Sequence, residues 1–325
     1  KGFNSHGVIA VKGGEVSPRD IERALDAAKA VAIPLDREVI HILPQEYIVD
    51  DQRGIADPMG MAGVRLEVKV HIVTGAVTSA QNIVRSCHKS GLDVSDIVLE
   101  SLASAKAVLT EEEREIGVAL IDLGGGTCDI AIFANDSIKH TGVLALGGQN
   151  LTNDIAFGLR TPMAAAEKIK IKHGAAIAEM VRPDEYIEVP SVGGREPRRL
   201  SRQVLAEICE PRMEEILTLL DQELVRSGLK NMIGAGVVLT GGTALIQGCQ
   251  ELGEQVFNLP TRIGYPRNVG GLKDMVNSPK FATAMGLLRF GAEKEGMEQK
   301  FRIRSDGNVF NSILSRMKKW FSEIS

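Results

Sequence analysis

Residues 119–133 read ALIDLGGGTCDIAIF, and this stretch decides the fold more than any other part of the chain. Apolar and β-branched residues lie on both sides of three consecutive glycines, a pattern that predicts a strand, a tight turn and a second strand. The phosphate loops of Rossmann and Walker proteins are followed by a helix instead. We therefore expect a β-hairpin whose turn is bare of side chains.

The glycines of this turn, Gly124, Gly125 and Gly126, can adopt positive φ and carry no side chain that would keep a ligand away from the backbone amides. Such a turn can point several N–H groups at one anion. Asp122 precedes the turn and Asp129 follows it, and a carboxylate is tolerated beside a phosphate when Mg²⁺ lies between them. A plain glycine hairpin with solvated aspartates is the alternative interpretation.

Residues 235–248, AGVVLTGGTALIQG, repeat this design. An apolar strand leads into Thr240, Gly241, Gly242 and Thr243, and the following segment, ALIQGCQELGEQVF, has the apolar spacing of a helix. Two strands that each end in a diglycine turn predict two halves of one ligand cradle.

The length and composition of the chain narrow the type of protein that it can be. With 325 residues the chain is long enough for two or more domains, and 44% hydrophobic and 25% charged residues are typical of a soluble globular protein. The net charge of −4 gives no support for nucleic-acid binding. The four cysteines are scattered without a CxxC pair, which predicts neither a disulfide framework nor a zinc site. No apolar run reaches the roughly 18 residues that span a bilayer.

The first part of the chain alternates short strand-like segments with one helix. This helix is predicted to begin after Ser17, which can cap it, with Pro18 in its first turn, and to run to about Ala32. Residues 1–76 therefore read as a small α+β unit.

Alternating helices and strands follow, which indicates an α/β core. We expect a helix over residues 79–88, a strand at DIVLE (96–100) and a helix over 101–109. Residues 161–232 hold charged helices and a basic loop, GGREPRRL, whereas residues 291–307 lose apolar periodicity, as a flexible tether does.

Four motifs occur in the order found in the superfamily of actin, sugar kinases and heat-shock chaperone ATPases: IDLGGGTCD, AEKIK, VVLTGGTALIQG and PKFATAMGLL. Two longer stretches, HILPQEYIVDDQRGIADPMGMAGVRLEVKVHIVTG and VLESLASAKAVLTEEEREIGVALIDLGGGT, make the chain resemble the bacterial FtsA family of cell-division proteins over essentially its whole length. The resemblance implies an α/β, actin-like (ribonuclease H-like) fold with two lobes around a nucleotide cleft, an extra small α+β subdomain and a C-terminal amphipathic helix.

The resemblance also implies a division of the chain. The extra subdomain would come first, and parts of the two lobes would alternate after it. In chain order the expected parts are 1–76 (extra subdomain), 77–117 (first lobe), 118–160 (second-lobe core), 161–234 (upper small subdomain), 235–270 (second-lobe core), 271–290 (first lobe), 291–307 (flexible tether) and 308–325 (membrane helix).

By the same resemblance, the turn from Gly124 to Thr127 would bind the phosphates of ATP, and Asp122 would help to hold Mg²⁺ through water. Glu100 stands where related ATPases carry a residue that orients the attacking water. A carboxylate that satisfies the dipole of a helix start is the alternative role for Glu100.

The adenosine half of the site is implied in the same way. Gly241, Gly242 and Thr243 match the adenosine motif of the superfamily, and Glu167 and Lys170 match the helix that contacts the ribose and base.

One motif of the family is not found. The first phosphate loop is expected on an amino-terminal β-hairpin, but the sequence begins at Lys1 and contains no such loop. We therefore expect a fragment or a processed product that holds ATP weakly by itself, and we expect an added amino-terminal hairpin to tighten the binding of Mg-ATP.

Residues 308–325, NVFNSILSRMKKWFSEIS, carry apolar side chains at helical spacing and basic residues on the opposite side. These features predict a helix that lies in a membrane interface. Docking of this helix on the protein's own body is the alternative. The predicted membrane-binding residues are Phe310, Ile313, Leu314, Met317, Trp320 and Phe321, with Val309 and Ile324 on the same stripe.

The resemblance implies an adaptor function: an actin-like, ATP-binding protein that polymerises, tethers FtsZ filaments to the cytoplasmic face of the inner membrane at the division septum, and recruits later division proteins. It implies at most weak ATPase activity. A sugar kinase or a chaperone-type ATPase of the same superfold is the alternative, but neither would require a tethered amphipathic helix.

In the FtsA family the tail peptide of FtsZ docks on the upper small subdomain, and the matching segment here is SRQVLAEICEPRMEEIL. Arg212 and Glu215 on this segment are candidate peptide-binding residues, together with Arg198 in the basic loop. A solvated helix face is the alternative for each of them.

Overall fold

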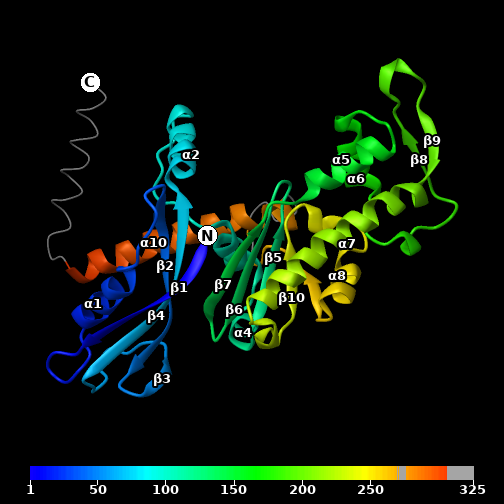
Figure 1. Ribbon diagram of the computed structural model, residues 1–325. Coiled ribbons are helices and arrows are strands. Elements are labelled where there is room, and N and C mark those ends of the chain that lie inside the picture. Colours follow the sequence, from blue (N-terminus) through cyan, green and yellow to red (C-terminus); the bar gives the residue numbers. More distant parts are fainter. Residues whose placement is uncertain (269, 271–275, 306–325) are drawn as a thin grey trace, which may run out of the picture.

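The computed structural model describes residues 1–268, 270 and 276–305. Figure 1 shows an elongated arrangement, with the N-terminal strands at one end, a sheet in the middle, and helices with a small hairpin at the other end. The strands are β1 Gly2–Ala10, β2 Arg37–Val49, β3 Gln52–Ile55, β4 Arg65–Ala76, β5 Val118–Leu123, β6 Cys128–Ala134, β7 Ser137–Leu144, β8 Tyr186–Val189, β9 Arg198–Ser201, β10 Val237–Thr240 and β11 Thr261–Ile263. The helices are α1 Pro18–Lys29, α2 Val77–Lys89, α3 Glu100–Val108, α4 Glu111–Ile116, α5 Gly148–Gly158, α6 Met163–His173, α7 Arg202–Arg226, α8 Cys249–Phe257 and α10 Ala282–Ser305.

The N-terminal sheet has the order β1-β4-β2-β3 with antiparallel neighbours. Helix α1 contacts β1 so closely that a Cβ at Gly7 would lie 2.1 Å from the backbone oxygen of Ala24. The sheet and the helix share one core, to which β4 contributes every second residue because strand side chains alternate between faces. These fully buried residues are Leu66, Val68, Val70 and Ile72.

The predicted start of α1 is confirmed. Ser17 caps the helix, and Asp20 completes a capping box in which each side chain accepts from the other residue's backbone amide. The helix ends at Lys29, earlier than the predicted end near Ala32.

The central sheet has the order β11-β10-β5-β6-β7. Strands β5, β6 and β7 are antiparallel neighbours, so the predicted hairpin at 119–133 is confirmed, while β10 runs parallel to both β5 and β11. Strand β5 is buried on both faces: Ile121 belongs to the core shared with α5, α7 and α8, and Leu120 belongs to the core shared with α3 and α10. The carboxyl ends of β5 and β10, where the glycine turns begin, therefore meet at one edge of the sheet.

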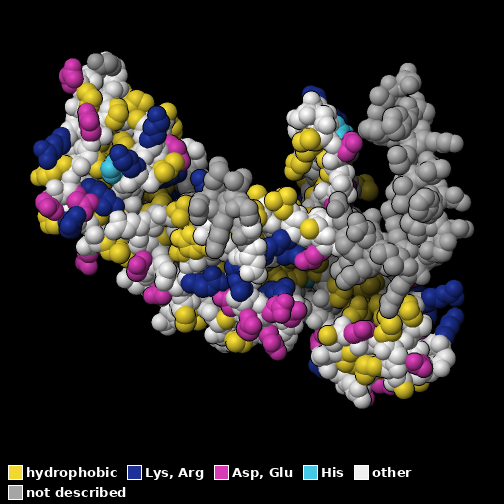
Figure 2. Space-filling model, turned by 180° about the vertical axis from the view of Figure 1, so that it is seen from behind, with side chains coloured by type: hydrophobic (Ala, Val, Ile, Leu, Met, Phe, Trp, Pro, Cys, Tyr) yellow, Lys and Arg dark blue, Asp and Glu magenta, His cyan; other side chains and the backbone are white. Residues whose placement is uncertain are grey.

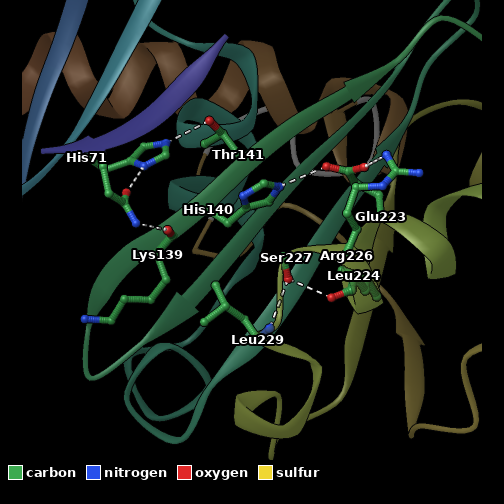
Figure 3. Close-up of polar contacts among 10 residues, drawn as sticks. His71, Lys139, His140, Thr141, Glu223, Leu224, Arg226, Ser227 and Leu229 are labelled. Carbon is green, nitrogen blue, oxygen red and sulfur yellow. Dashed lines mark hydrogen bonds and ion pairs between the residues drawn. The ribbon is translucent and has the colours of Figure 1, made fainter.

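The N-terminal sheet lies against the outer strand β7 through a chain of hydrogen bonds (Figure 3). The imidazole of His71 is 2.6 Å from Asn4 Oδ1 through Nδ1 and 2.9 Å from Thr141 Oγ1 through Nε2. Since Asn4 Oδ1 can only accept, Nδ1 carries the proton and Nε2 accepts from the Thr141 hydroxyl. The neighbouring His140 is 3.2 Å from Glu223 on α7, so β7 connects the two parts of the molecule.

The buried contact at His71 makes the stability of the protein sensitive to acid. Burial, reinforced by the nearby His140, lowers the pKa of His71 from 6.5 to about 4. Below about pH 6.5 the imidazole of His71 therefore takes up a proton in the unfolded chain but not in the folded chain. The full contribution of His71 to the free energy of unfolding is present only above that pH. As the pH falls from about 6.5 toward the folded pKa, the free energy of unfolding decreases by about 3 kcal/mol in total.

We expect the stability difference between the parent protein and His71→Gln, measured by urea unfolding, to shrink by about 3 kcal/mol between about pH 7 and pH 4. Glutamine has no proton to gain in this range and keeps a polar side chain at this position. A difference that stays constant over this range would show that His71 does not carry the effect.

Two local predictions are wrong, and a third is right except for where its helix begins. Residues 96–99 form no strand; instead the Leu99 amide donates to His41 Nε2 at 2.9 Å, and α3 begins at Glu100. The helix predicted after the second diglycine turn begins only at Cys249, after a short 3₁₀ turn. The tether predicted for 291–307 is helical over its described part, because α10 continues to Ser305. Residues 306–307 and the predicted membrane helix lie outside the described residues.

Candidate functional site

The carbonyl groups of the turn after β5 accept hydrogen bonds from neighbouring segments and so fix the turn. Gly124 O accepts from the Thr243 hydroxyl at 2.9 Å and from the Gly148 amide at 3.0 Å. Gly125 O accepts from the Gln149 amide at 2.7 Å. These hydrogen bonds to the start of α5 and to the second diglycine turn fix the loop and leave the amides of Gly125, Gly126 and Thr127 free.

The amides of this turn are open to solvent. Within the part of the chain that the structure describes, no oxygen accepts a hydrogen bond from the amides of Gly125, Gly126 or Thr127, and all three residues are exposed. A Cβ at Gly125 or at Gly126 would meet no atom within 4 Å. Free N–H groups on bare backbone suit an anion, so this turn fits a phosphate group.

The turn does not use the positive φ that its glycines permit. None of Gly124, Gly125 and Gly126 lies in the left-handed region, and the turn closes through a hydrogen bond of 3.0 Å from the Gly124 amide to Thr127 O. Glycine is needed at 124 for space, since a Cβ there would lie 2.7 Å from that carbonyl oxygen.

The second diglycine turn lies directly beside the first. Thr240 at the end of β10 pairs with Asp122 on β5, and Gly241 then turns the chain with φ +88°. A Cβ at Gly241 would lie 2.4 Å from Asp122 Oδ1 and 2.5 Å from Leu123 O. Only glycine allows this conformation and this approach together.

The two turns line one cavity of about 320 Å³. Gly125 comes from the first turn, Gly242 and Thr243 come from the second, and α6 contributes Glu167 and Lys170. Residues predicted from separate motifs are therefore brought together in the structure.

Lys170 stabilises the floor of this cavity. Its side chain is 9% exposed, and Nζ lies 3.0 Å from Gly148 O, 2.8 Å from the Thr152 hydroxyl and 2.8 Å from Glu167 Oε2. Because the ammonium group already has three protein partners, the 42% exposed Glu167 is the member of the pair that is more available to a ligand.

Some residues of the site were not predicted from the sequence, among them Gly147, Gly148 and Lys280. Gly147 and Gly148 lie against the first turn: a Cβ at Gly147 would be 2.7 Å from Gly125 O, and one at Gly148 would be 2.4 Å from the Thr243 hydroxyl. Lys280 lines the cavity from the segment before α10. The stretch LGGQN (146–150) was the available signal, because a third glycine pair precedes a helix there.

Three carboxyl groups lie beside the turns. Asp122 is buried and accepts from the Ser104 hydroxyl at 2.6 Å, and burial raises the pKa of its carboxyl. Burial and the neighbouring Asp122 raise the pKa of Asp129 to about 6. Burial together with Asp129 and Asp122 raises the pKa of Glu100 to about 7. Repulsion among these three carboxylates favours the binding of a cation beside them.

The described residues contain no cluster of three or more His, Cys, Asp or Glu side chains that could hold a metal ion by themselves. A divalent cation at Asp122 would therefore need ligands from water and from a bound phosphate, which is how Mg²⁺ is usually held in nucleotide sites. The buried carboxylate and the free amides beside it fit such a cation with its phosphate.

The predicted peptide-binding residues already have partners within the protein. Arg212 lies 2.5 Å from Asp154 on α5 and also pairs with Glu215. Arg198 donates to Leu159 O at the end of α5. These contacts join α7 and the β8–β9 hairpin to α5. The predicted membrane-binding residues Phe310, Ile313, Leu314, Met317, Trp320 and Phe321 lie outside the described residues.

A second cavity, of about 400 Å³, lies between α3, α4 and α10, away from the glycine turns. Figure 2 shows basic and acidic side chains interspersed over the middle of the back face. The charge of Lys106 is offset by its ion pair with Glu293, and Arg289 donates to Lys106 O at 2.7 Å. None of the described residues that line this cavity is a glycine, so it does not offer the side-chain-free backbone of the first cavity, which is therefore the better phosphate site.

No helix in the described ranges is long and apolar enough to cross a bilayer.

The fold is shared with solved structures of low sequence identity. The PilM–PilN type IV pilus biogenesis complex matches with a TM-score of 0.58 and 15% identity, over 89% of this chain and 76% of that one. MreB5 of Spiroplasma citri bound to ADP matches with a TM-score of 0.53 and 20% identity, over 69% of this chain and 68% of that one. Together with the sheet order, these likenesses show the actin-like α/β fold.

The sequence comparisons are more specific. Residues 119–286 match the family model described as cell division protein FtsA, and residues 1–74 match the SHS2 domain inserted in FtsA. The FtsA protein of Pseudomonas aeruginosa is 50% identical over 98% of this chain and 78% of its own length. That of Escherichia coli K12 is 41% identical over 98% of this chain and 77% of its own length. Because one FtsA family model matches more than half of the chain and one FtsA protein is 50% identical over 98% of it, this actin-like chain belongs to the FtsA family of cell-division proteins.

Proposed function

We propose that the cavity between the two diglycine turns binds an adenine nucleotide with Mg²⁺, and that this binding controls assembly of a division scaffold. The observation that carries the proposal is the meeting of two bare turns, at Gly125 and Gly242, on one cavity whose other wall holds Glu167. The neighbour MreB5 is described as bound to ADP, which agrees with this use of the fold.

The roles of the residues follow from their positions. The open amides of Gly125, Gly126 and Thr127 would bind phosphate oxygens, and the second turn with Glu167 would hold the nucleoside. Bound Mg²⁺ supplies positive charge to the phosphate oxygens. Asp122 would hold the ion through water, since its carboxylate is fixed beside the turn. Glu100, with its raised pKa, would orient a water molecule for weak hydrolysis.

The nucleotide site is tested by Asp122→Asn in the full-length protein. Asparagine keeps the shape of the side chain but removes its charge, so the gain in affinity for a fluorescent ADP analogue on adding Mg²⁺ should fall about tenfold, a loss of about 1.4 kcal/mol. Affinity in EDTA should change little, because the amides of the turn are untouched.

The matched control is Asp136→Asn, which changes a carboxylate in the exposed turn after β6, where it pairs with Arg114. If both variants keep the full Mg²⁺ dependence, Asp122 does not hold the ion. If the parent binds no nucleotide at all, the proposal fails.

The adaptor function extends beyond the described residues. We propose that the protein polymerises, that residues 308–325 bind the cytoplasmic face of the inner membrane at the septum, and that the upper helices bind the tail peptide of FtsZ. The support for the membrane role is the apolar stripe with basic residues opposite it, which suits a helix in an interface.

For the peptide we keep Arg198, Arg212 and Glu215 as candidates. Arg212 is engaged by Asp154 at 2.5 Å, so a peptide carboxylate would have to join or replace an existing ion pair. Glu215 is 49% exposed and is the most accessible of the paired groups in this cluster. It is therefore the better first contact for a basic group of the peptide.

A further inference from the structure

Asp122 is held by hydroxyl groups from two helices that are distant in the sequence. Ser104 Oγ on α3 donates to Asp122 Oδ2 at 2.6 Å, and Thr283 Oγ1 on α10 donates to the same oxygen at 3.3 Å. The two hydroxyl groups are themselves 2.9 Å apart. Three segments of the chain therefore meet at one carboxylate oxygen.

The seating of α10 on α3 fixes where Thr283 lies. One turn further along α10, Gly286 contacts α3 so closely that a Cβ there would lie 1.8 Å from Ala103 O. Thr283 and Gly286 are three residues apart and so share one face of the helix. A shift of α10 along or away from α3 would therefore also withdraw the Thr283 hydroxyl from Asp122.

The other carboxylate oxygen is confined as well. Asp122 Oδ1 lies on the side of Gly241, where even a Cβ would come within 2.4 Å of it. With Oδ2 held by two donors and Oδ1 next to the second glycine turn, the side chain has one orientation. A carboxylate that is fixed before a cation arrives loses less conformational entropy on binding it.

We propose that Ser104 and Thr283 are positioning residues that fix Asp122 for a divalent cation and couple the occupancy of the nucleotide cavity to the seating of α10 on α3. This inference rests on the proposed function and assigns a regulatory connection to the same site. By linkage, a ligand that binds only when Asp122 is fixed also stabilises the seated position of α10. Helix α10 ends at Ser305 and residues 306–325 follow it in the sequence, so α10 is the described element that would connect the cavity to them.

The test compares three variants of the full-length protein. Thr283→Val keeps the shape of the side chain and removes its hydroxyl, Thr283→Ser keeps the hydroxyl, and Ser104→Ala removes the other donor. Ser137→Ala is the control, because that hydroxyl donates to Ala134 O in a distant turn. Two quantities are measured: the affinity for a fluorescent ADP analogue with Mg²⁺ and with EDTA, and hydrogen exchange of the amides of residues 284–290 with and without Mg-ADP.

We expect Thr283→Val and Ser104→Ala each to lose about tenfold of the Mg²⁺-dependent gain in affinity. The extra protection of α10 on adding Mg-ADP should disappear in both. Thr283→Ser and Ser137→Ala should stay within about twofold of the parent in affinity and keep the protection, which a purely structural role of the side-chain volume would not produce.

Two results would overturn the inference while leaving the proposed function intact. One is a parent that binds Mg-ADP while Thr283→Val and Ser104→Ala bind it equally well. The other is a Thr283→Ser variant as impaired as Thr283→Val, since this would show that keeping the hydroxyl group does not preserve the effect. A parent without Mg²⁺-dependent binding would overturn both proposals. If Thr283→Val does not fold, Ser104→Ala with Thr283→Ser decides the question alone.

Discussion

Gly241→Ala is expected to lower the free energy of unfolding by about 2 to 5 kcal/mol and to abolish nucleotide binding. Two independent costs add. An alanine at φ +88° is strained, and its Cβ would lie 2.4 Å from Asp122 Oδ1 and 2.5 Å from Leu123 O. The end of β10 would have to move away from β5, which would separate the two glycine turns. Urea unfolding and nucleotide titration measure the two effects.

The adjacent glycine provides a matched control. Gly242 has an ordinary helical φ of −67°, and the nearest atom to a Cβ there would be Lys280 Cβ at 3.9 Å. Gly242→Ala should therefore change the stability by less than about 0.5 kcal/mol, while it projects a methyl group toward the cavity. Equal destabilisation by the two substitutions would contradict the close approach of the turns.

The second large effect concerns the tail. Trp320→Glu with Phe321→Glu should abolish sedimentation of the polymerised full-length protein with anionic liposomes, because it places two charges in the apolar stripe. Burial of the stripe supplies several kcal/mol at about 25 cal/mol per Å², and ordering the helix costs a comparable amount, so the margin for one tail is small. Many tails on one filament bind firmly through effective concentration.

Ser312→Glu with Ser315→Glu is the control for this experiment. It makes the same change in net charge on the polar side of the helix, so binding should weaken, at about 1 kcal/mol per charge near the anionic surface, but should not vanish. Sedimentation of the Trp320 and Phe321 double variant at the level of the parent would exclude the membrane role of this stripe.

The parts of the fold that the sequence predicts well are those with strong local patterns. The apolar and β-branched residues on both sides of residues 124–126 predicted the β5–β6 hairpin, and Ser17 with Pro18 predicted the start of α1. The apolar run at 96–100 misled the interpretation because a short run does not distinguish a strand from an extended segment, and here the Leu99 amide bonds to His41 instead of to a strand.

The parts of the site that were missed depend on contacts between distant residues. The sequence shows a glycine pair at 147–148, but not that α5 folds back so that the Gly148 amide donates to Gly124 O. In the same way, the pairing of Arg212 with Asp154, 58 residues away, is set by the packing of α7 on α5. Such contacts arise from tertiary structure, which local patterns do not encode.

The most direct test of the central claim is to locate the bound nucleotide. The full-length protein is irradiated with 8-azido-ATP and Mg²⁺, and the labelled peptides are identified by mass spectrometry. The account predicts labelling of residues that line the cavity between the glycine turns, in the peptides that contain Gly242–Ile246 or Lys280, and loss of the label when unmodified ATP is added. Labelling of the second cavity instead, at Arg267 or Arg289, or labelling that ATP does not displace, would contradict it.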